Sequence, residues 1–101
     1  MKKDLISEIS IIEKKLTIRP QHETFEYIYR AAMEVNWNVE NKVLYSPVPR
    51  DWTYIDWFKQ IHSAVLDEYG CFLEISKNTI WNNISENLKA DILEFYNNKK
   101  T

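Results

Sequence analysis

The sequence predicts a single small α+β domain in which four helices pack on a two- or three-stranded, mainly antiparallel sheet. Three observations lead to this expectation. Apolar residues recur at helical spacing in four stretches, they alternate or form short runs in others, and one glycine and three prolines separate the stretches. A chain of 101 residues has the length of one domain, so residues 1–101 are expected to form one unit.

Two helices are expected in the first third of the chain. Residues 3–16 place one apolar stripe on a helix, formed by Leu5, Ile9, Ile12 and Leu16. Ile11 points away from this stripe, which hints at a contact with a partner chain. Residues 21–35 repeat the helical spacing after Pro20, with Phe25, Ile28, Ala32 and Val35 on one face.

Residues 36–46 change to the alternating pattern that is typical of strands. Trp37 and Val39 alternate with asparagines, and a second apolar run ends at Tyr45. Glu40–Asn41 is the expected turn between two short strands. Pro47 and Pro49 end the second strand, because proline cannot donate to a sheet.

The second half of the chain begins with the clearest helix, residues 52–69. Asp51 is expected to cap its first turn, and Gly70 to end it in the left-handed conformation. Residues 71–75, CFLEI, form a short strand, and residues 79–81 either extend the sheet or begin a turn. A last helix is expected over residues 85–97, with Ser85 as its cap.

Composition argues against several classes of function. The net charge of −2 and the basic residues at the two ends predict no face for nucleic acid. No apolar stretch is long enough to span a membrane, no signal peptide is present, and the single Cys71 forms no disulfide framework, so a cytoplasmic protein is expected. His22 and Glu26 supply only two metal-capable side chains, so no metal and no cofactor are expected.

The densest chemistry lies in residues 46–58, SPVPRDWTYIDWF. Packing at the start of a helix explains most of this stretch, but Trp52 falls on the polar side of the helix together with Asp56. Arg50 stands beside Trp52, and Tyr45 is expected near it in space. An exposed Trp next to Arg at a helix start is typical of a recognition surface.

Two further candidates lie outside this stretch. His62 falls on the apolar face of the third helix, either as a core histidine or as part of an active site with Glu68 or Asp56. Trp81 is expected to line a pocket with Trp52 and Trp57. The chain lacks a Gly-rich phosphate loop and the motifs G-x-S-x-G, H-E-x-x-H and C-x-x-C, so catalysis is less favoured than binding.

The run LYSPVPRDWTYIDWFKQI, followed by EYGCFLEI and NTIWNNI, resembles a pattern in integron cassette proteins, which are small proteins of bacterial mobile gene cassettes. The shared features, within residues 37–84, are Pro-x-x-Trp-x-x-x-x-Trp at the start of a helix and a later Thr-x-Trp. The resemblance implies a mobile bacterial accessory protein of α+β fold, often oligomeric, and it carries over no catalytic residues.

The sequence as a whole therefore favours a homodimer that binds a protein partner through exposed aromatic residues, as adaptors, antitoxins and immunity proteins do. Binding of a small aromatic or anionic ligand in a Trp-lined pocket is the second hypothesis. A small enzyme that uses His62 is the third. The expected binding residues are Tyr45, Arg50, Trp52, Asp56, His62 and Trp81.

Overall fold

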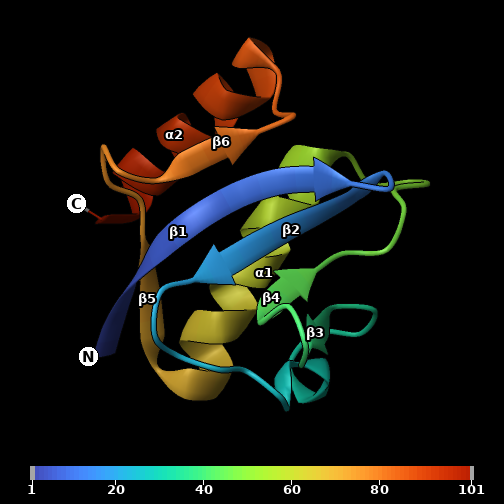
Figure 1. Ribbon diagram of the computed structural model, residues 1–101, viewed down its shortest axis with the longest axis vertical. Coiled ribbons are helices and arrows are strands. Elements are labelled where there is room, and N and C mark those ends of the chain that lie inside the picture. The colour runs from blue at the N-terminus through green and yellow to red at the C-terminus, as the bar shows by residue number, and fades with distance from the viewer. Residues whose placement is uncertain (1, 101) are drawn as a thin grey trace.

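The computed structural model describes residues 2–100 as one mixed six-stranded sheet with two α-helices on the same face (Figure 1). The elements in chain order are β1 (Lys2–Ile12), β2 (Lys15–Pro20), a 3-10 helix (Ile28–Arg30), β3 (Asn36–Asn38), β4 (Val43–Tyr45), α1 (Tyr54–Tyr69), β5 (Cys71–Glu74), β6 (Ile80–Asn82) and α2 (Glu86–Lys100). The expectation of four helices on a two- or three-stranded sheet was therefore wrong. Among the described residues, no helix is both long and apolar enough to cross a membrane.

Strand β1 is the centre of the sheet, and three strands pair with it. β2 runs antiparallel along one edge, and β4 and then β3 continue the sheet beyond β2. β5 and β6 run parallel to β1 along its other edge, one after the other, opposite Lys2–Leu5 and Glu8–Ser10. Helix α1 connects β4 to β5, which lie on opposite sides of the β1–β2 pair.

Residues 3–16, expected as a helix, form instead most of a β-hairpin. Its two-residue turn is Glu13–Lys14, and both residues have positive φ angles (52° and 67°). A β-bulge between Ile6 and Glu8 adds one residue to β1, so that Ile6 and Ile9 are both buried although they lie three positions apart. The bulge therefore produced a spacing that imitates one turn of a helix.

The expected helix over residues 21–35 is also absent. The chain there makes successive turns in which a backbone N–H bonds to a carbonyl three residues back, with one short 3-10 helix. The buried residues are nevertheless those expected from the spacing, namely Phe25, Ile28, Ala32 and Val35. The spacing identified the inward side chains correctly, but not a regular α-helix.

Later elements follow the sequence expectations more closely. β3 and β4 pair antiparallel with Trp37 opposite Leu44, which confirms the strand pair in residues 36–46. Gly70 ends α1 with φ 60°, and its N–H bonds to the carbonyl of Leu66 at 2.9 Å. Asp51 is not the cap of α1, because Thr53 holds that position. Ser85 does cap α2, since its hydroxyl accepts from the N–H of Leu88 at 3.1 Å.

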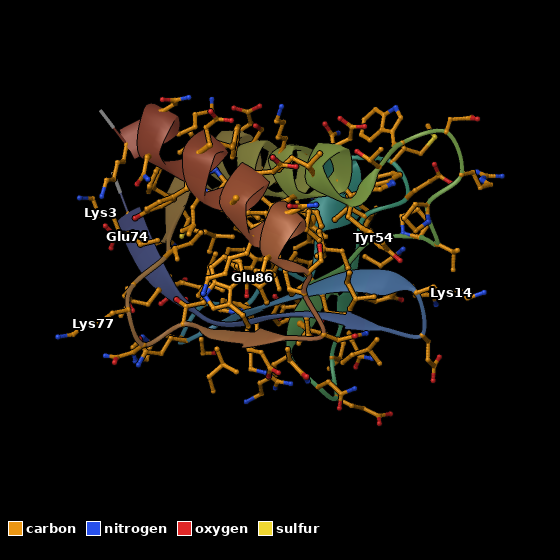
Figure 2. All side chains as sticks on the ribbon, turned by 90° about the horizontal axis from the view of Figure 1, so that it is seen from above. Lys3, Lys14, Tyr54, Glu74, Lys77 and Glu86 are labelled. Carbon is orange, nitrogen blue, oxygen red and sulfur yellow. The ribbon has the colours of Figure 1, made fainter. Side chains whose placement is uncertain are left out.

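The sheet has one covered face and one uncovered face. Figure 2 shows both helices on one side of the sheet and side chains without a covering element on the other. Ile9, Ile18, Leu44 and Leu73 lie in the core between sheet and helices. Ile11 is partly buried and packs against this core, so it lies on the same side as the other apolar residues and not opposite them, as its helical placement suggested.

Candidate functional site

An open hollow lies where the segment before α1 meets the turns after the 3-10 helix. Its volume is about 310 Å³. We call it the Trp52 pocket, and its lining residues are Met33, Glu34, Pro47, Val48, Arg50, Asp51, Trp52, Trp57 and Gln60. Three of its apolar side chains are exposed to solvent, with exposed fractions of 85% for Met33, 42% for Val48 and 43% for Trp52.

Local sequence explains how these side chains come together. Pro47 and Pro49 keep the chain extended after β4, and Thr53 then begins α1. A capping box fixes that start, because Thr53 Oγ1 accepts from the N–H of Asp56 while Asp56 accepts from the N–H of Thr53. On the other side, Glu34 has a φ angle of 72°, which turns the chain toward β3.

Charged side chains lie along one side of the Trp52 pocket. Arg50 Nη2 is 3.3 Å from Glu34 Oε1, and both side chains are well exposed, so this ion pair contributes little to stability. Asp51 adds a second carboxylate to the lining. The pocket thus combines two tryptophans with one positive and two negative side chains.

Trp57 is the buried part of the pocket, since only 7% of it is exposed. The ring centroids of Trp52 and Trp57 are 4.7 Å apart, with an angle of 46° between the planes. The indole Nε1 of Trp57 has no hydrogen-bond partner among the described residues and no accessible surface. Because buried donors are normally paired, this N–H is an unusual feature of the site.

Only two of the six expected binding residues, Arg50 and Trp52, line this pocket. Asp56 lies in the first turn of α1 and is occupied by the capping box. The backbone N–H of Thr53, its hydroxyl and then Lys59 lower the pKa of Asp56 below its ordinary value. A carboxylate held in this way positions the helix rather than a ligand.

Tyr45 and Trp81 lie elsewhere in the molecule. Tyr45 is on β4 opposite Thr17, on the uncovered face of the sheet, with the Nζ of Lys15 5.4 Å from its ring centroid. Trp81 is on β6, with the Nζ of Lys89 5.2 Å from its ring centroid. Trp52 and Trp57 therefore line one pocket, as expected, but Trp81 does not join them.

His62 is a core residue with no exposed surface. Its Nε2–H donates to the carbonyl of Leu73 at 2.9 Å, and its buried Nδ1 has no hydrogen-bond partner within residues 2–100. The rings around it are those of Phe58, Phe72 and Phe95. Burial lowers the pKa of His62, so the imidazole is neutral, and Glu68 is exposed on the surface of α1. This arrangement does not bring His62 to a substrate.

Cys71 and His22 also lie outside any reactive arrangement. Cys71 is buried, and burial, followed by the carboxylates of Asp4 and Glu23, raises the pKa of its thiol. His22 Nδ1 lies 3.3 Å from Asp4 Oδ1. Within residues 2–100, no three His, Cys, Asp or Glu side chains are grouped so that they could hold a metal ion.

Sequence reasoning missed several lining residues of the Trp52 pocket, chiefly Met33, Glu34, Val48 and Gln60. Met33 and Glu34 were placed at the end of a helix that does not form, so their approach to Arg50 had no local signal. Val48 carried one usable signal, because an apolar residue between two prolines has no strand or helix in which to be buried.

Comparison with known proteins gives two matches. The family described as "Integron Cassette Protein Hfx_Cass5" matches residues 4–79, which is more than half of the chain. A solved structure of the integron cassette protein Hfx_Cass5, from the mobile metagenome of the North West Arm sewage outfall, is 39% identical over 93% of this chain and 95% of that chain, with a TM-score of 0.47. No curated protein matches the chain.

Proposed function

Because the chain belongs to the Hfx_Cass5 family of integron cassette proteins, we propose that it is a non-catalytic accessory protein that binds a partner protein at the Trp52 pocket. The supporting observation is the exposure of Met33, Val48 and Trp52 around one hollow. Single exposed apolar side chains are ordinary, but a cluster with Trp and Arg resembles the centre of a binding surface.

A protein partner suits the shape of the pocket better than a small molecule does. Small-molecule sites usually enclose roughly 300–1,000 Å³ and surround most of the ligand. The Trp52 pocket is at the low end of that range and open, with its exposed side chains standing around the hollow. An apolar side chain of a partner would fill the hollow while Met33 and Val48 contact the surface around it.

The polar groups of the pocket support the same proposal. A partner that moves the exposed Trp52 ring would give an acceptor, such as a backbone carbonyl, access to the unpaired Nε1–H of Trp57. The pocket has two carboxylates, Glu34 and Asp51, but only one positive side chain, Arg50. This negative balance favours a partner with basic residues around the apolar side chain that fills the hollow. An adaptor, antitoxin or immunity-like role fits such a surface, in the cytoplasm, where the free thiol of Cys71 stays reduced.

Selection of random peptides displayed on phage tests this proposal. Peptides that bind the wild-type chain should carry a bulky apolar residue next to a basic one, and Trp52→Ala should abolish their binding while the chain stays folded by circular dichroism. Tyr29→Ala is the matched control, because Tyr29 is an exposed aromatic residue outside the pocket. Recovery only of peptides that bind the wild type and Trp52→Ala equally would refute the proposal.

Self-association is a second part of the proposal, with a different surface in support. The uncovered face of the sheet exposes Ile12 and Ile80, with Tyr45 on the same face. A second copy of the chain that packs on this face would cover these side chains and leave the Trp52 pocket open for its partner. We therefore propose a homodimer that pairs through its sheets.

A further inference from the structure

A second hollow lies between α2 and the connection from β5 to β6. We call it the Trp81 groove, and its volume is about 500 Å³. Trp81 comes from β6, and Tyr96 and Asn97 come from α2. The rest of the polar lining consists of Ser76, Thr79 and three lysines, namely Lys77, Lys89 and Lys100.

The bulge in β1 accounts for this groove. β5 leaves β1 at Glu74, just before the bulge, and β6 joins β1 again at Ile80, just after it. The hydroxyl of Thr79 donates to the carbonyl of Ile6 at 2.8 Å, so a side chain replaces the missing strand pairing. The connection that results carries Lys77 away from the sheet, as Figure 2 shows.

The charge of the groove is entirely positive. No aspartate or glutamate is among its lining residues, although the whole chain has a net charge of −2. Within residues 2–100, none of the three lysines forms an ion pair, and the nearby carboxylate of Glu74 lies 3.9 Å from the Nζ of Lys3. The groove is therefore a local concentration of positive charge in a chain of net negative charge.

Two of the lysines lie over aromatic rings instead of carboxylates. Lys89 Nζ is 5.2 Å from the ring centroid of Trp81, and Lys100 Nζ is 5.4 Å from that of Tyr96. Cation–π contacts at an exposed site are weak, so these ammonium groups remain free to meet an anion. The Trp81 indole is partly exposed, packs against the core and carries Lys89 over its ring, so it offers a surface to a planar group where Lys89 turns away toward an anion.

We propose that the Trp81 groove binds a small organic anion that carries a planar ring, of the size and chemistry of a nucleoside monophosphate. The ammonium groups of Lys77, Lys89 and Lys100 meet the phosphate as point charges. The ring of the ligand packs on the Trp81 indole in the place that Lys89 leaves when its ammonium group turns to the phosphate. The amide of Asn97 supplies both a donor and an acceptor for the polar edge of the ring. The groove is open, as the Trp52 pocket is, so its charged and aromatic side chains rather than enclosure would hold the ligand.

Titration of the full chain with AMP, followed by ¹⁵N NMR at low salt, tests this proposal. AMP should shift the indole N–H resonance of Trp81 in a saturable way, with inorganic phosphate weaker than AMP and adenosine weaker still. In Trp81→Leu, followed through the backbone N–H resonances of the groove, the affinity for AMP should fall at least about fivefold. The affinity for inorganic phosphate should change less than about twofold, because only the ring contact is removed. An equal loss for both ligands would overturn the role of the ring.

The charged part of the proposal has its own control. Replacement of Lys77, Lys89 and Lys100 together by Gln should lower the affinity for AMP at least about tenfold. The matched triple variant replaces Lys14, Lys42 and Lys59 by Gln, because these lysines are exposed and do not line the groove. It should change the affinity for AMP less than about twofold. Equal effects of the two triple variants, or no saturable shift up to about 10 mM AMP, would overturn the proposal.

Discussion

The carboxylate of Asp4, near the start of β1, accepts a hydrogen bond from the backbone N–H of Glu23 across 2.8 Å. The same oxygen accepts from the N–H of His22 at 3.0 Å, and the other oxygen accepts from the N–H of Leu5 at 3.0 Å. Only 5% of Asp4 is exposed. One buried carboxylate therefore holds His22 and Glu23, which follow β2, against the start of β1.

Removal of this carboxylate should destabilise the fold. Asp4→Ala leaves the N–H groups of His22 and Glu23 without an acceptor, and we expect a loss of about 2–3 kcal/mol in the free energy of unfolding. Urea unfolding measures this loss. Asp67→Ala, which removes an exposed carboxylate from α1, should change the free energy by less than about 0.5 kcal/mol. Similar values for the two variants would show that the hydrogen bonds of Asp4 contribute little.

The hairpin turn offers a stabilising change. Glu13 and Lys14 hold positive φ angles that cost energy for residues with a Cβ atom, and the two-residue turn favours Asn followed by Gly. Glu13→Asn combined with Lys14→Gly should raise the midpoint of thermal unfolding and add about 1 kcal/mol of stability. Glu13→Val combined with Lys14→Val should act in the opposite direction, since β-branched residues tolerate this conformation poorly. A lower midpoint for the Asn–Gly variant would contradict the turn geometry.

His62 should make the stability of the protein depend on pH. Burial lowers its pKa below the ordinary value of 6.5, against the hydrogen bond to the Leu73 carbonyl, and Lys99 lowers it further. The unfolded chain therefore binds a proton at a higher pH than the folded chain does. Stability is retained above about pH 6.5 and declines as the pH falls below it, toward the lowered pKa of the folded state.

The contribution of His62 to this decline can be isolated by substitution. His62→Gln keeps a donor for the Leu73 carbonyl and cannot titrate, so the difference in unfolding free energy between about pH 7.5 and about pH 5 should shrink. Met33→Gln, which changes an exposed residue that does not titrate, should keep the wild-type difference. Should His62→Gln show the same decline as the wild type, other groups would be responsible for it.

The proposed homodimer can be checked by light scattering across a dilution series. Ile80, which is 59% exposed on the uncovered face, should lie in the interface, and Ile80→Asp should give a monomer. Val39→Asp changes an exposed residue of the β3–β4 loop and should leave the dimer intact. Trp52→Ala should also leave it intact. A dimer lost in Trp52→Ala but kept in Ile80→Asp would assign the second copy to the Trp52 pocket, and a wild-type monomer would exclude self-association.

Comparison of α1 with the β1–β2 hairpin shows what the sequence could reveal. Helix α1 has the right period over sixteen residues and a glycine at its end, so its length and buried face were predictable. Its cap was misplaced by two residues because Asp51 and Thr53 are both good caps, and only the reciprocal bond with Asp56 selects Thr53.

The hairpin could not be recognised from spacing alone. A bulge shifts the alternation of β1 by one residue, and its turn contains neither glycine nor asparagine, so both local signals of a strand pair were missing. The site was found in part, since Arg50 and Trp52 lie two positions apart in sequence. Met33 and Glu34 join them only through the turns before β3, which depend on tertiary packing.

Strand β1 is paired along both edges, and this has a kinetic consequence. The β2 edge closes through a local hairpin, which forms within microseconds. The other edge stays open until residues 71–82 reach it from the far end of the sequence. The rate of folding should therefore be set by this long-range closure rather than by the hairpin. Until it occurs, Lys2–Ser10 presents an unsatisfied strand on which another nascent chain can assemble, so a slow closure favours aggregation during synthesis.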